Sequence, residues 1–415
     1  MLADELRDQV EYADDAVTAP LPTPFPIRLR GRVLGRLDRQ ALLAAVQSFA
    51  ISRLILLVAT YLAMAFHPSV WGRDHPASPT LWDAWYQWDA RWYVRVARSG
   101  YHWHDLHTWS SVAFFPLYPI LILVLVTVIP ISTKLVAILI SNALFFSALY
   151  VLHRLVRQDF GRAAAGRAVL YLSMFPTAMF FFAGYSESPF LLWSVLSVLS
   201  MRRRRWFWAG VWGCAAAATR SQGLALIVPF GIECWLAYGS SWRQLLRGLW
   251  IGLIPIGWVG LALFMRAQFD NPFLFIESQR AWHRTTSWPW VGVWETLQRI
   301  HPERIATVDP AHNLIELACV VLFGALIAAG WRRIPLSYSC YALASYGLVL
   351  INPAALDHYY LPLMSASRLC LSLFPCFITL ALLGKHELVD RLVTAVGPAL
   401  LAIFTVIFLQ GAWVA

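Results

Sequence analysis

Charged residues are scarce in this sequence. Asp, Glu, Lys and Arg together make up only 13% of its 415 residues, whereas a soluble protein of ordinary composition carries about 25%. Hydrophobic residues reach 59%, and the chain contains 21 Trp. This composition excludes a soluble globular protein and predicts an integral membrane protein.

Lysine and cysteine are also rare. Lys134 and Lys385 are the only lysines, so nearly all of the positive charge comes from Arg. The net charge of +10 does not indicate a nucleic-acid partner, because the Arg residues cluster in short loops between apolar runs, as orientation in a bilayer requires. The six Cys lack CxxC spacing and lie mostly inside apolar runs. We therefore expect them to be small buried hydrophobic residues, with neither a disulfide framework nor a metal site.

Apolar runs recur from residue 42 onward. The predicted spans are 42–66, 134–152, 168–184, 188–201, 206–219, 224–238, 249–267, 313–330, 336–352, 369–384 and 394–412. Several are shorter than the ~20 residues of a straight crossing. The sequence predicts an all-α polytopic membrane protein with one transmembrane domain, residues 42–415. The polar, Arg-rich segment 1–41 has no signal-peptide pattern, and we expect it to be a cytoplasmic tail.

A further apolar run, 113–131, decides the orientation. If it does not fully cross, the Arg-rich loops all fall on the same side as the basic tail, as the positive-inside rule requires. If it crosses alone, the four Arg of loop 154–167 move to the other side. We therefore expect a re-entrant segment within an external loop, residues 67–133, although paired short helices would also restore the pattern. The loops 268–312 and 353–368 then share the extracytoplasmic side.

The stretch from residue 82 to 99 contains an unusual carboxylate. Drawn as one helix at 100° per residue, it has an aromatic face with Asp89 in its middle and three arginines opposite. The face consists of Trp82, Trp85, Trp92, Tyr93 and Val96, and the arginines are Arg91, Arg95 and Arg98. A carboxylate in such a surface is costly unless it has a partner or a task. Asp89 is therefore either paired with an Arg or a general base for an acceptor hydroxyl.

Asp83 occurs in the same Trp-Asp-Ala tripeptide as Asp89. Thr80 and Asp83 have the T-x-x-D spacing of a capping box at the start of a helix. The pattern therefore predicts a structural role for Asp83.

Several motifs between residues 80 and 380 resemble one protein family. The segment WDARWYVRVARSGY, followed by AFFPLYP, resembles the signature of the PIG-V family, which are polyprenyl-phosphate-sugar-dependent mannosyltransferases of the GT-C class. Four more segments resemble the family: GYSESPF, TRSQG, SQRAWHRTTSWPW and SRLCLSLFPCFITLA. In this chain Gln222 replaces an Asn of the family pattern, and Leu369 stands where Tyr is usual.

The resemblance implies a fold and a site. It implies a GT-C-like bundle of about 11–12 transmembrane helices, with juxtamembrane helices in a large first external loop. It also implies that Asp89, and not Asp83, is the catalytic acid/base. The amide retained at Gln222 would preserve hydrogen bonding there, whereas the role of position 369 is in doubt.

Four arginines are candidates for binding the phosphate of a donor. Arg220 lies at the turn TRSQG, and its forked guanidinium suits phosphate oxygens; snorkelling to the interface is the alternative. Arg280 and Arg284 lie among aromatic residues that could equally form an interfacial belt. Arg368 could equally be a helix-end anchor.

Three other polar sites have competing explanations. Glu187, in YSES, could pair with Arg220 or bind a sugar hydroxyl, but capping by its flanking serines would also explain the motif. His358 and the tyrosines after it could contact sugar or anchor the interface. The group His102, His104, His107 and Asp105 fits no zinc pattern, so we expect no metal and no other cofactor.

These features lead to one main functional hypothesis. The chain is expected to be an inverting glycosyltransferase of the bacterial plasma membrane that moves a sugar, with mannose suggested by the resemblance. The donor would be a polyprenyl-phosphate-linked sugar among the membrane lipids, and the acceptor a hydroxyl of a glycan or lipid on the external face. The alternative is a transporter or flippase of a lipid-linked or anionic substrate, which predicts inverted halves and broken helices near the midplane. A non-catalytic scaffold would leave Asp89 unexplained.

Overall fold

The computed structural model describes residues 38–66, 80–239, 241, 246–300 and 307–414. The chain divides into Met1–Arg36 and Leu37–Ala415. The predicted cytoplasmic tail therefore lies outside the described residues except for 38–41, and the first part of the predicted external loop, 67–79, lies outside them too.

The described residues form helices and connecting turns, without a β-strand. The α-helices are α2 (Arg39–Phe66), α3 (Leu81–Ala84), α4 (Asp89–Ser99), α5 (Leu117–Val128), α6 (Thr133–Phe160), α7 (Arg162–Ser173), α8 (Glu187–Arg202), α9 (Trp206–Thr219), α10 (Ile227–Tyr238), α12 (Ile256–Phe269), α13 (Leu274–Glu277), α14 (Val291–Arg299), α15 (Val308–Gly330), α16 (Leu336–Leu350), α17 (Ala366–Cys370), α18 (Phe374–Leu383) and α19 (Glu387–Leu409). The 3-10 helices are η2 (Ser111–Ala113), η3 (Ala178–Phe181), η4 (Ser221–Leu226), η5 (Leu246–Leu253), η6 (Ser278–Trp282) and η8 (Leu356–His358).

Four of these helices, α2, α6, α15 and α19, are long and apolar enough to cross a membrane. There are five spans if η5 and α12, which meet at a 41° bend, count as one. Shorter apolar helices, such as α16 and α18, occupy other predicted spans. The prediction of an all-α polytopic membrane protein is confirmed. The length criterion yields fewer spans in the described chain than the 11–12 expected.

Run 113–131 contains α5, which has only 12 residues. At ~1.5 Å per residue it extends about 18 Å, less than the ~30 Å hydrocarbon core. The re-entrant segment stays a prediction, because helices of similar length, such as α10 with 12 residues, occupy predicted spans. The run 168–184 is interrupted instead of continuous: α7 ends at Ser173, and η3 follows after Pro176. Proline removes a backbone donor and disfavours helix at the preceding residue, which explains the break.

The aromatic stretch is two helices, so the prediction of one continuous helix is wrong. α3 ends at Ala84 and α4 begins at Asp89. Between them Trp88 has φ +49°, which is rare for a bulky residue. Asp89 is therefore the first residue of a helix, and is not central on an unbroken face.

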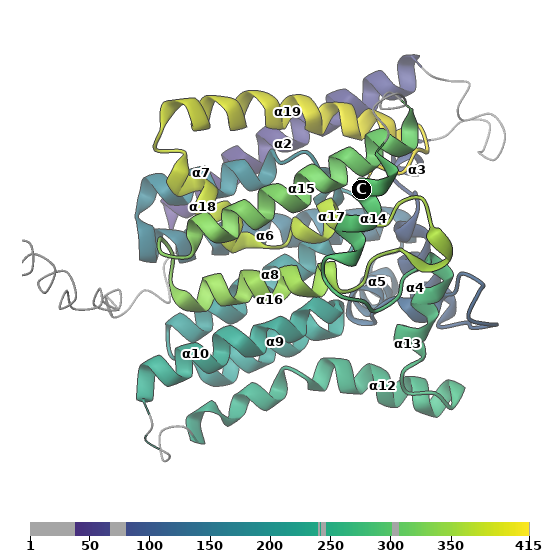
Figure 1. The fold of residues 1–415 in the computed structure, drawn as a ribbon, viewed down its shortest axis with the longest axis horizontal. Helices are drawn as coiled ribbons and strands as arrows, with labels where there is room; N and C mark the ends of the chain where they lie inside the picture. Colours follow the sequence, from purple (N-terminus) through teal and green to yellow (C-terminus); the bar gives the residue numbers. More distant parts are fainter. Residues whose placement is uncertain (1–37, 67–79, 240, 242–245, 301–306, 415) are drawn as a thin grey trace, which may run out of the picture. The chain divides into compact units, whose positions relative to one another are not determined.

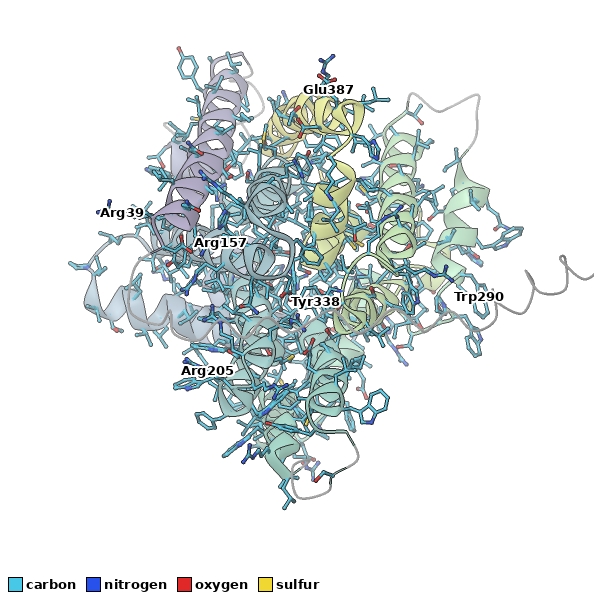
Figure 2. The ribbon with its side chains drawn as sticks, turned by 90° about the vertical axis from the view of Figure 1, so that its left-hand side faces the viewer. Arg39, Arg157, Arg205, Trp290, Tyr338 and Glu387 are labelled. Atoms are coloured by element: carbon cyan, nitrogen blue, oxygen red, sulfur yellow. The ribbon has the colours of Figure 1, made fainter. Side chains whose placement is uncertain are left out.

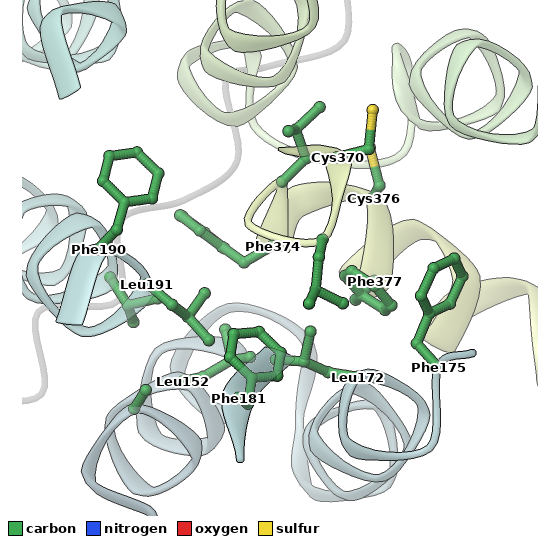
Figure 3. Packing of buried hydrophobic residues seen from close by; sticks show 14 of the residues in the cluster. Leu152, Leu172, Phe175, Phe181, Phe190, Leu191, Cys370, Phe374, Cys376 and Phe377 are labelled. Atoms are coloured by element: carbon green, nitrogen blue, oxygen red, sulfur yellow. The ribbon is translucent and has the colours of Figure 1, made fainter. Parts of the chain in front are cut away.

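Most of the long helices run side by side across Figure 1, and α3, α4, α13 and α14 gather at its right-hand end. The core between α6, α7, α8 and α18 is filled by aromatic and aliphatic side chains (Figure 3). Phe145 stacks on Phe181 with ring centroids 4.3 Å apart, and Phe175 meets Phe377 edge-on at 5.4 Å. Cys370 and Cys376 are buried in this core, as expected for small hydrophobic residues.

The two ends of α6 lie at two polar regions. Near its start, Lys134 binds Asp83 of α3 at 2.9 Å. At its other end, Asp159 accepts hydrogen bonds from Arg202 (3.1 Å) and Tyr338 (2.6 Å). Arg202 also pairs with Glu233 of α10 at 3.2 Å. In Figure 2, which views the helices from the second end, Tyr338 lies near the centre of the bundle. This second polar cluster joins α6, α8, α10 and α16.

Candidate active site

Four charged side chains form a continuous chain of alternating sign. Arg368 Nη2 lies 2.8 Å from Asp89 Oδ2, and Arg368 Nε lies 3.1 Å from Glu187 Oε1. The same Glu187 oxygen accepts a 2.5 Å hydrogen bond from Arg220 Nη1. The order is therefore Asp89, Arg368, Glu187, Arg220, and we call this set the charge chain.

Each member of the charge chain comes from a different helix. Asp89 and Glu187 are the first residues of α4 and α8, where the free backbone N–H groups favour a negative charge. Arg220 follows the last residue of α9, where the helix dipole favours a cation. Arg368 lies on the short α17. The local sequence of helix ends therefore supplies charges of the sign that each position favours.

The ends of the charge chain are more accessible than its middle. The exposed fraction of the side chain is 18% for Asp89 and 11% for Arg220, but 9% for Arg368 and 1% for Glu187. Buried charges are tolerated when they are paired. The two inner residues thus neutralise each other, and each end residue keeps a side that faces outward.

Aromatic rings surround Arg368. Its guanidinium carbon lies 5.4 Å from the ring centres of Phe180 and Tyr185 and 5.5 Å from that of Trp413. The edge of Trp88, the residue before Asp89, also meets Trp413, at 5.3 Å. Rings at these distances attract a guanidinium by cation–π interaction and exclude water from it.

The YSES turn connects α4 to the charge chain. Tyr93 of α4 and Ser186 share a 2.7 Å hydrogen bond between hydroxyls, and Arg220 Nη1 lies 3.5 Å from the Ser186 hydroxyl. Ser188 donates to the carbonyl of Phe181 at 3.2 Å. Ser186 makes no side-chain cap on α8 in the described structure. Of the alternatives for Glu187, the described structure shows the pairing with Arg220, and capping by Ser186 does not explain the motif.

Arg284 is close to the charge chain and donates hydrogen bonds to two backbone carbonyls. Nη1 donates to the carbonyl of Asn352 at 2.9 Å and Nη2 to that of Met364 at 2.7 Å. Burial and the positive charge of Arg368 lower the pKa of Arg284, Asp89 opposes both effects, and the net result is a pKa of about 10. Arg284 therefore contributes positive charge near the site and pins the loop before α17.

The other predicted site residues are divided between the site and its surroundings. Gln222 is buried in η4, two residues after Arg220, and neither amide atom has a partner among the described residues. Arg280 is exposed on η6. His358 is also exposed, and only its carbonyl is bonded in the described structure, by Arg299 at 3.2 Å. The structure brings Gln222 to the site and leaves Arg280 and His358 outside it.

Asp83 has the structural role that its spacing predicted. Its carboxylate accepts from the Thr80 backbone at 3.1 Å, and its own backbone N–H donates to the Thr80 hydroxyl at 3.3 Å. The capping box is complete. Lys134 occupies the remaining carboxylate oxygen, Oδ1.

The sequence analysis overlooked a buried carboxylate on α15. Glu316 is fully buried and accepts hydrogen bonds from the Ser367 N–H (2.7 Å) and the Ser367 hydroxyl (3.1 Å). His312 Nε2 lies 3.4 Å from the same carboxylate. A signal was present, because Glu316 is an ionisable residue inside a predicted span, 313–330, and such residues are expensive in a membrane.

No group of three or more His, Cys, Asp or Glu able to hold a metal ion occurs in the described part of the chain. His102, His104 and His107 are exposed. Asp105 accepts hydrogen bonds from the backbone of His107 and Thr108, both at 2.8 Å, so a local turn accounts for it.

The helices and the charge chain define an all-α polytopic membrane protein with an ionic site assembled from four helix segments. Residues 43–246, just under half of the chain, match the family described as Mannosyltransferase (PIG-V). This match confirms the resemblance seen in the motifs over that part of the chain. No curated protein matches the chain.

The chain is also similar to two solved structures. ArnT from Cupriavidus metallidurans, bound to undecaprenyl phosphate, is 14% identical, with 89% of this chain and 77% of that chain covered and a TM-score of 0.47. The oligosaccharyltransferase AglB from Archaeoglobus fulgidus, in complex with an inhibitory peptide and a dolichol-phosphate, is 12% identical, with 87% and 55% covered and a TM-score of 0.38. Because both TM-scores lie below 0.5, these likenesses establish neither the fold nor the activity.

Proposed function

We propose that the protein transfers a hexosyl group, with mannose the first candidate, from a polyprenyl-phosphate donor to an acceptor hydroxyl on the extracytoplasmic side. The family match over residues 43–246 supports the reaction class, and the charge chain is the structural observation that supports the proposal most strongly. It offers a carboxylate at one accessible end and a guanidinium at the other. A group transfer from a phosphate needs both: a base for the acceptor and a cation for the leaving group.

Asp89 is the proposed base. As the acceptor oxygen attacks the anomeric carbon, Asp89 takes the hydroxyl proton, and the bond between that carbon and the phosphate oxygen breaks. The electron pair of this bond leaves with the polyprenyl phosphate. The single displacement inverts the anomeric configuration, unlike the two-carboxylate retaining mechanism. Arg368 fixes the orientation of Asp89 through the 2.8 Å ion pair.

Arg220 is the proposed cation for the leaving phosphate. Its hydrogen bonds to described residues use Nη1 alone, so Nε and Nη2 can bind two phosphate oxygens. Gln222, with both amide atoms unpaired, is placed to bind the sugar or the phosphate. The charge of Arg284 would assist from a distance.

An apolar groove supplies a place for the lipid part of the donor. It lies between α4, α5 and α12, has a volume of about 420 Å³, and is lined by residues such as Val96, Ile120 and Phe264. Ile120 and Phe264 are 48% and 44% exposed, so the rim is open towards lipid. Gly257, on its wall, packs against the backbone of α9 at Ala218, two residues before Arg220. A polyprenyl chain in this groove would bring its phosphate towards Arg220.

Transfer can be tested directly with purified protein in vesicles. The protein is incubated with polyprenyl-phosphate-[³H]mannose and a lipid and glycan extract of the source membrane. Label in a new product, together with free polyprenyl phosphate, is the expected result. Movement of intact donor across the bilayer without product would replace the transferase with the transporter alternative. Labelled donor that neither reacts nor moves would refute both.

A further inference from the structure

We infer that Glu316 is a positioning residue that holds Arg368 in the charge chain. The inference rests on the proposed function, and it concerns a buried carboxylate that the proposed reaction does not use. Glu316 lies on α15, one of the four long apolar helices, and its side chain is 1% exposed. An acid at such a place is costly unless it performs a task.

The two hydrogen bonds that Glu316 accepts both come from one residue of α17. Oε2 accepts from the backbone N–H of Ser367 at 2.7 Å, and Oε1 accepts from the Ser367 hydroxyl at 3.1 Å. One carboxylate therefore fixes both the backbone and the side chain of Ser367. Ser367 is the immediate neighbour of Arg368, so the same contacts fix the point from which the Arg368 side chain departs.

The segment before Arg368 needs such a restraint. Ser365 has φ +71°, in the left-handed region that residues with a side chain rarely occupy. Such a conformation persists when the surroundings hold it in place. Arg284 binds the carbonyl of the preceding residue, Met364, at 2.7 Å. Arg284 on one side and Glu316 on the other thus hold the turn that delivers Arg368.

Small displacements of this turn would move Arg368 and thereby change the orientation of Asp89. Arg368 reaches Asp89 and Glu187 with two different nitrogen atoms. A guanidinium that serves two carboxylates at once has little freedom to move. Loss of the Glu316 contacts should release α17 and leave Asp89 without its orienting cation. The donor phosphate, proposed to bind Arg220, would be affected less.

The test compares Glu316→Ala, Glu316→Gln and Glu233→Gln in the purified protein. The amide of Gln can still accept from Ser367, so Glu316→Gln should stay within about fivefold of wild-type kcat. Glu316→Ala should lower kcat by about 100-fold, the size of effect that misplacement of a reacting group by ~1 Å can produce, with little change in donor KM. Glu233, a buried carboxylate of the second polar cluster, is the control for structural damage. Its variant should lower thermal stability without lowering kcat per folded molecule.

A double-mutant cycle with Arg368→Lys separates positioning from general stability. If Glu316 acts through Arg368, adding Glu316→Ala to Arg368→Lys should change kcat less than twofold. Additive losses, equal kcat losses in Glu316→Ala and Glu233→Gln, or an effect on donor KM alone would overturn the inference. Should Asp89→Asn keep full transfer, the proposed role of Asp89 as the base fails by itself. Hydrogen exchange then tests the contact without activity: the Ser367 amide must exchange faster in Glu316→Ala than in wild type, and unchanged exchange would refute the inference.

Discussion

Asp83 and Asp89 occupy the same position in two Trp-Asp-Ala tripeptides, but their carboxylates bind different cations, Lys134 and Arg368. Asp83 is held by Thr80 and Lys134, in a capping box and an ion pair. Asp89 is held by Arg368, a residue distant in sequence, and belongs to the charge chain. The two acids thus form a natural pair of test and control positions.

Asp89→Asn should lower kcat by at least 100-fold, because a general base contributes about 10²–10⁴ in rate and the amide is nearly isosteric but not basic. Asp83→Asn should keep kcat within about threefold. Initial rates with polyprenyl-phosphate-[³H]mannose, normalised to folded protein, measure both. Similar rates in Asp89→Asn and wild type would remove Asp89 from the mechanism.

Arg220→Ala should weaken binding of polyprenyl phosphate by about 10–100-fold, since a hydrogen bond to a charged group contributes about 1.5–3 kcal/mol. Arg280→Ala is the matched control, because Arg280 is exposed on η6 and lies outside the charge chain. Its affinity should change less than twofold. Binding titrations with polyprenyl phosphate in detergent measure the affinity of both variants. A larger loss in Arg280→Ala would identify Arg280 as the phosphate ligand instead.

Gly260→Leu should block the groove without disturbing the fold. A Cβ at Gly260 meets no atom within 4 Å, and the residue lines the groove. The variant should raise KM for long-chain donors by about tenfold, which is the cost of one or two poorly accommodated apolar groups. The KM for short-chain donors should stay unchanged. Gly347→Leu on α16 is the control, since that position is equally open and lies elsewhere. If Gly260→Leu leaves KM unchanged for both long-chain and short-chain donors, the lipid lies outside this groove.

Arg202→Met should destabilise the protein by about 3–5 kcal/mol, because Asp159 and Glu233 would remain buried without their cation. The cluster lies at the end of α6 away from the charge chain, so kcat per folded molecule should be unchanged. Thermal unfolding in detergent gives the first quantity and radiolabel transfer the second. An unchanged melting temperature would show that the two carboxylates find other partners.

Acid should remove the stabilisation that Asp83 provides. The hydrogen bond from Lys134 and those from Thr80 hold the pKa of Asp83 below its ordinary value. A carboxyl with a lowered folded-state pKa stabilises the fold above its unfolded pKa of about 3.9, and this contribution disappears as the pH falls through the folded value. The melting temperature of wild type should therefore exceed that of Asp83→Asn at pH 7, and the difference should shrink towards pH 3. A difference that grows in acid would contradict the assignment.

The sequence predicted those features that depend on neighbours along the chain. The Thr80–Asp83 capping box was predicted because its spacing is local, and α9 was predicted with its observed bounds because its apolar run has clear ends. The break before Asp89 was missed because neither Gly nor Pro marks it. Contacts from elsewhere explain it: Trp85 is fully buried and its indole N–H binds Thr60 of α2 at 3.2 Å.

The partners within the site could be predicted only in part for the same reason. Pairing of Glu187 with Arg220 was one of the alternatives that the sequence offered, and both turns were expected on one side of the membrane. The pairing of Asp89 with Arg368 depends on the Arg368 side chain reaching from α17 to the start of α4, which no local pattern encodes. Arg284 was a phosphate candidate, and its hydrogen bonds to the carbonyls of Asn352 and Met364 depend on loops that the sequence does not position.

The charge chain includes a residue beyond the segment that matches the family. Asp89, Glu187 and Arg220 lie within residues 43–246, which carry the family match, whereas Arg368 lies far beyond it. A shortened gene product that stopped after α10 would still be assigned to the family by its sequence. It would nevertheless be chemically incomplete, because Asp89 would lack its ion pair with Arg368 and Glu187 would keep only Arg220 as a partner in the charge chain.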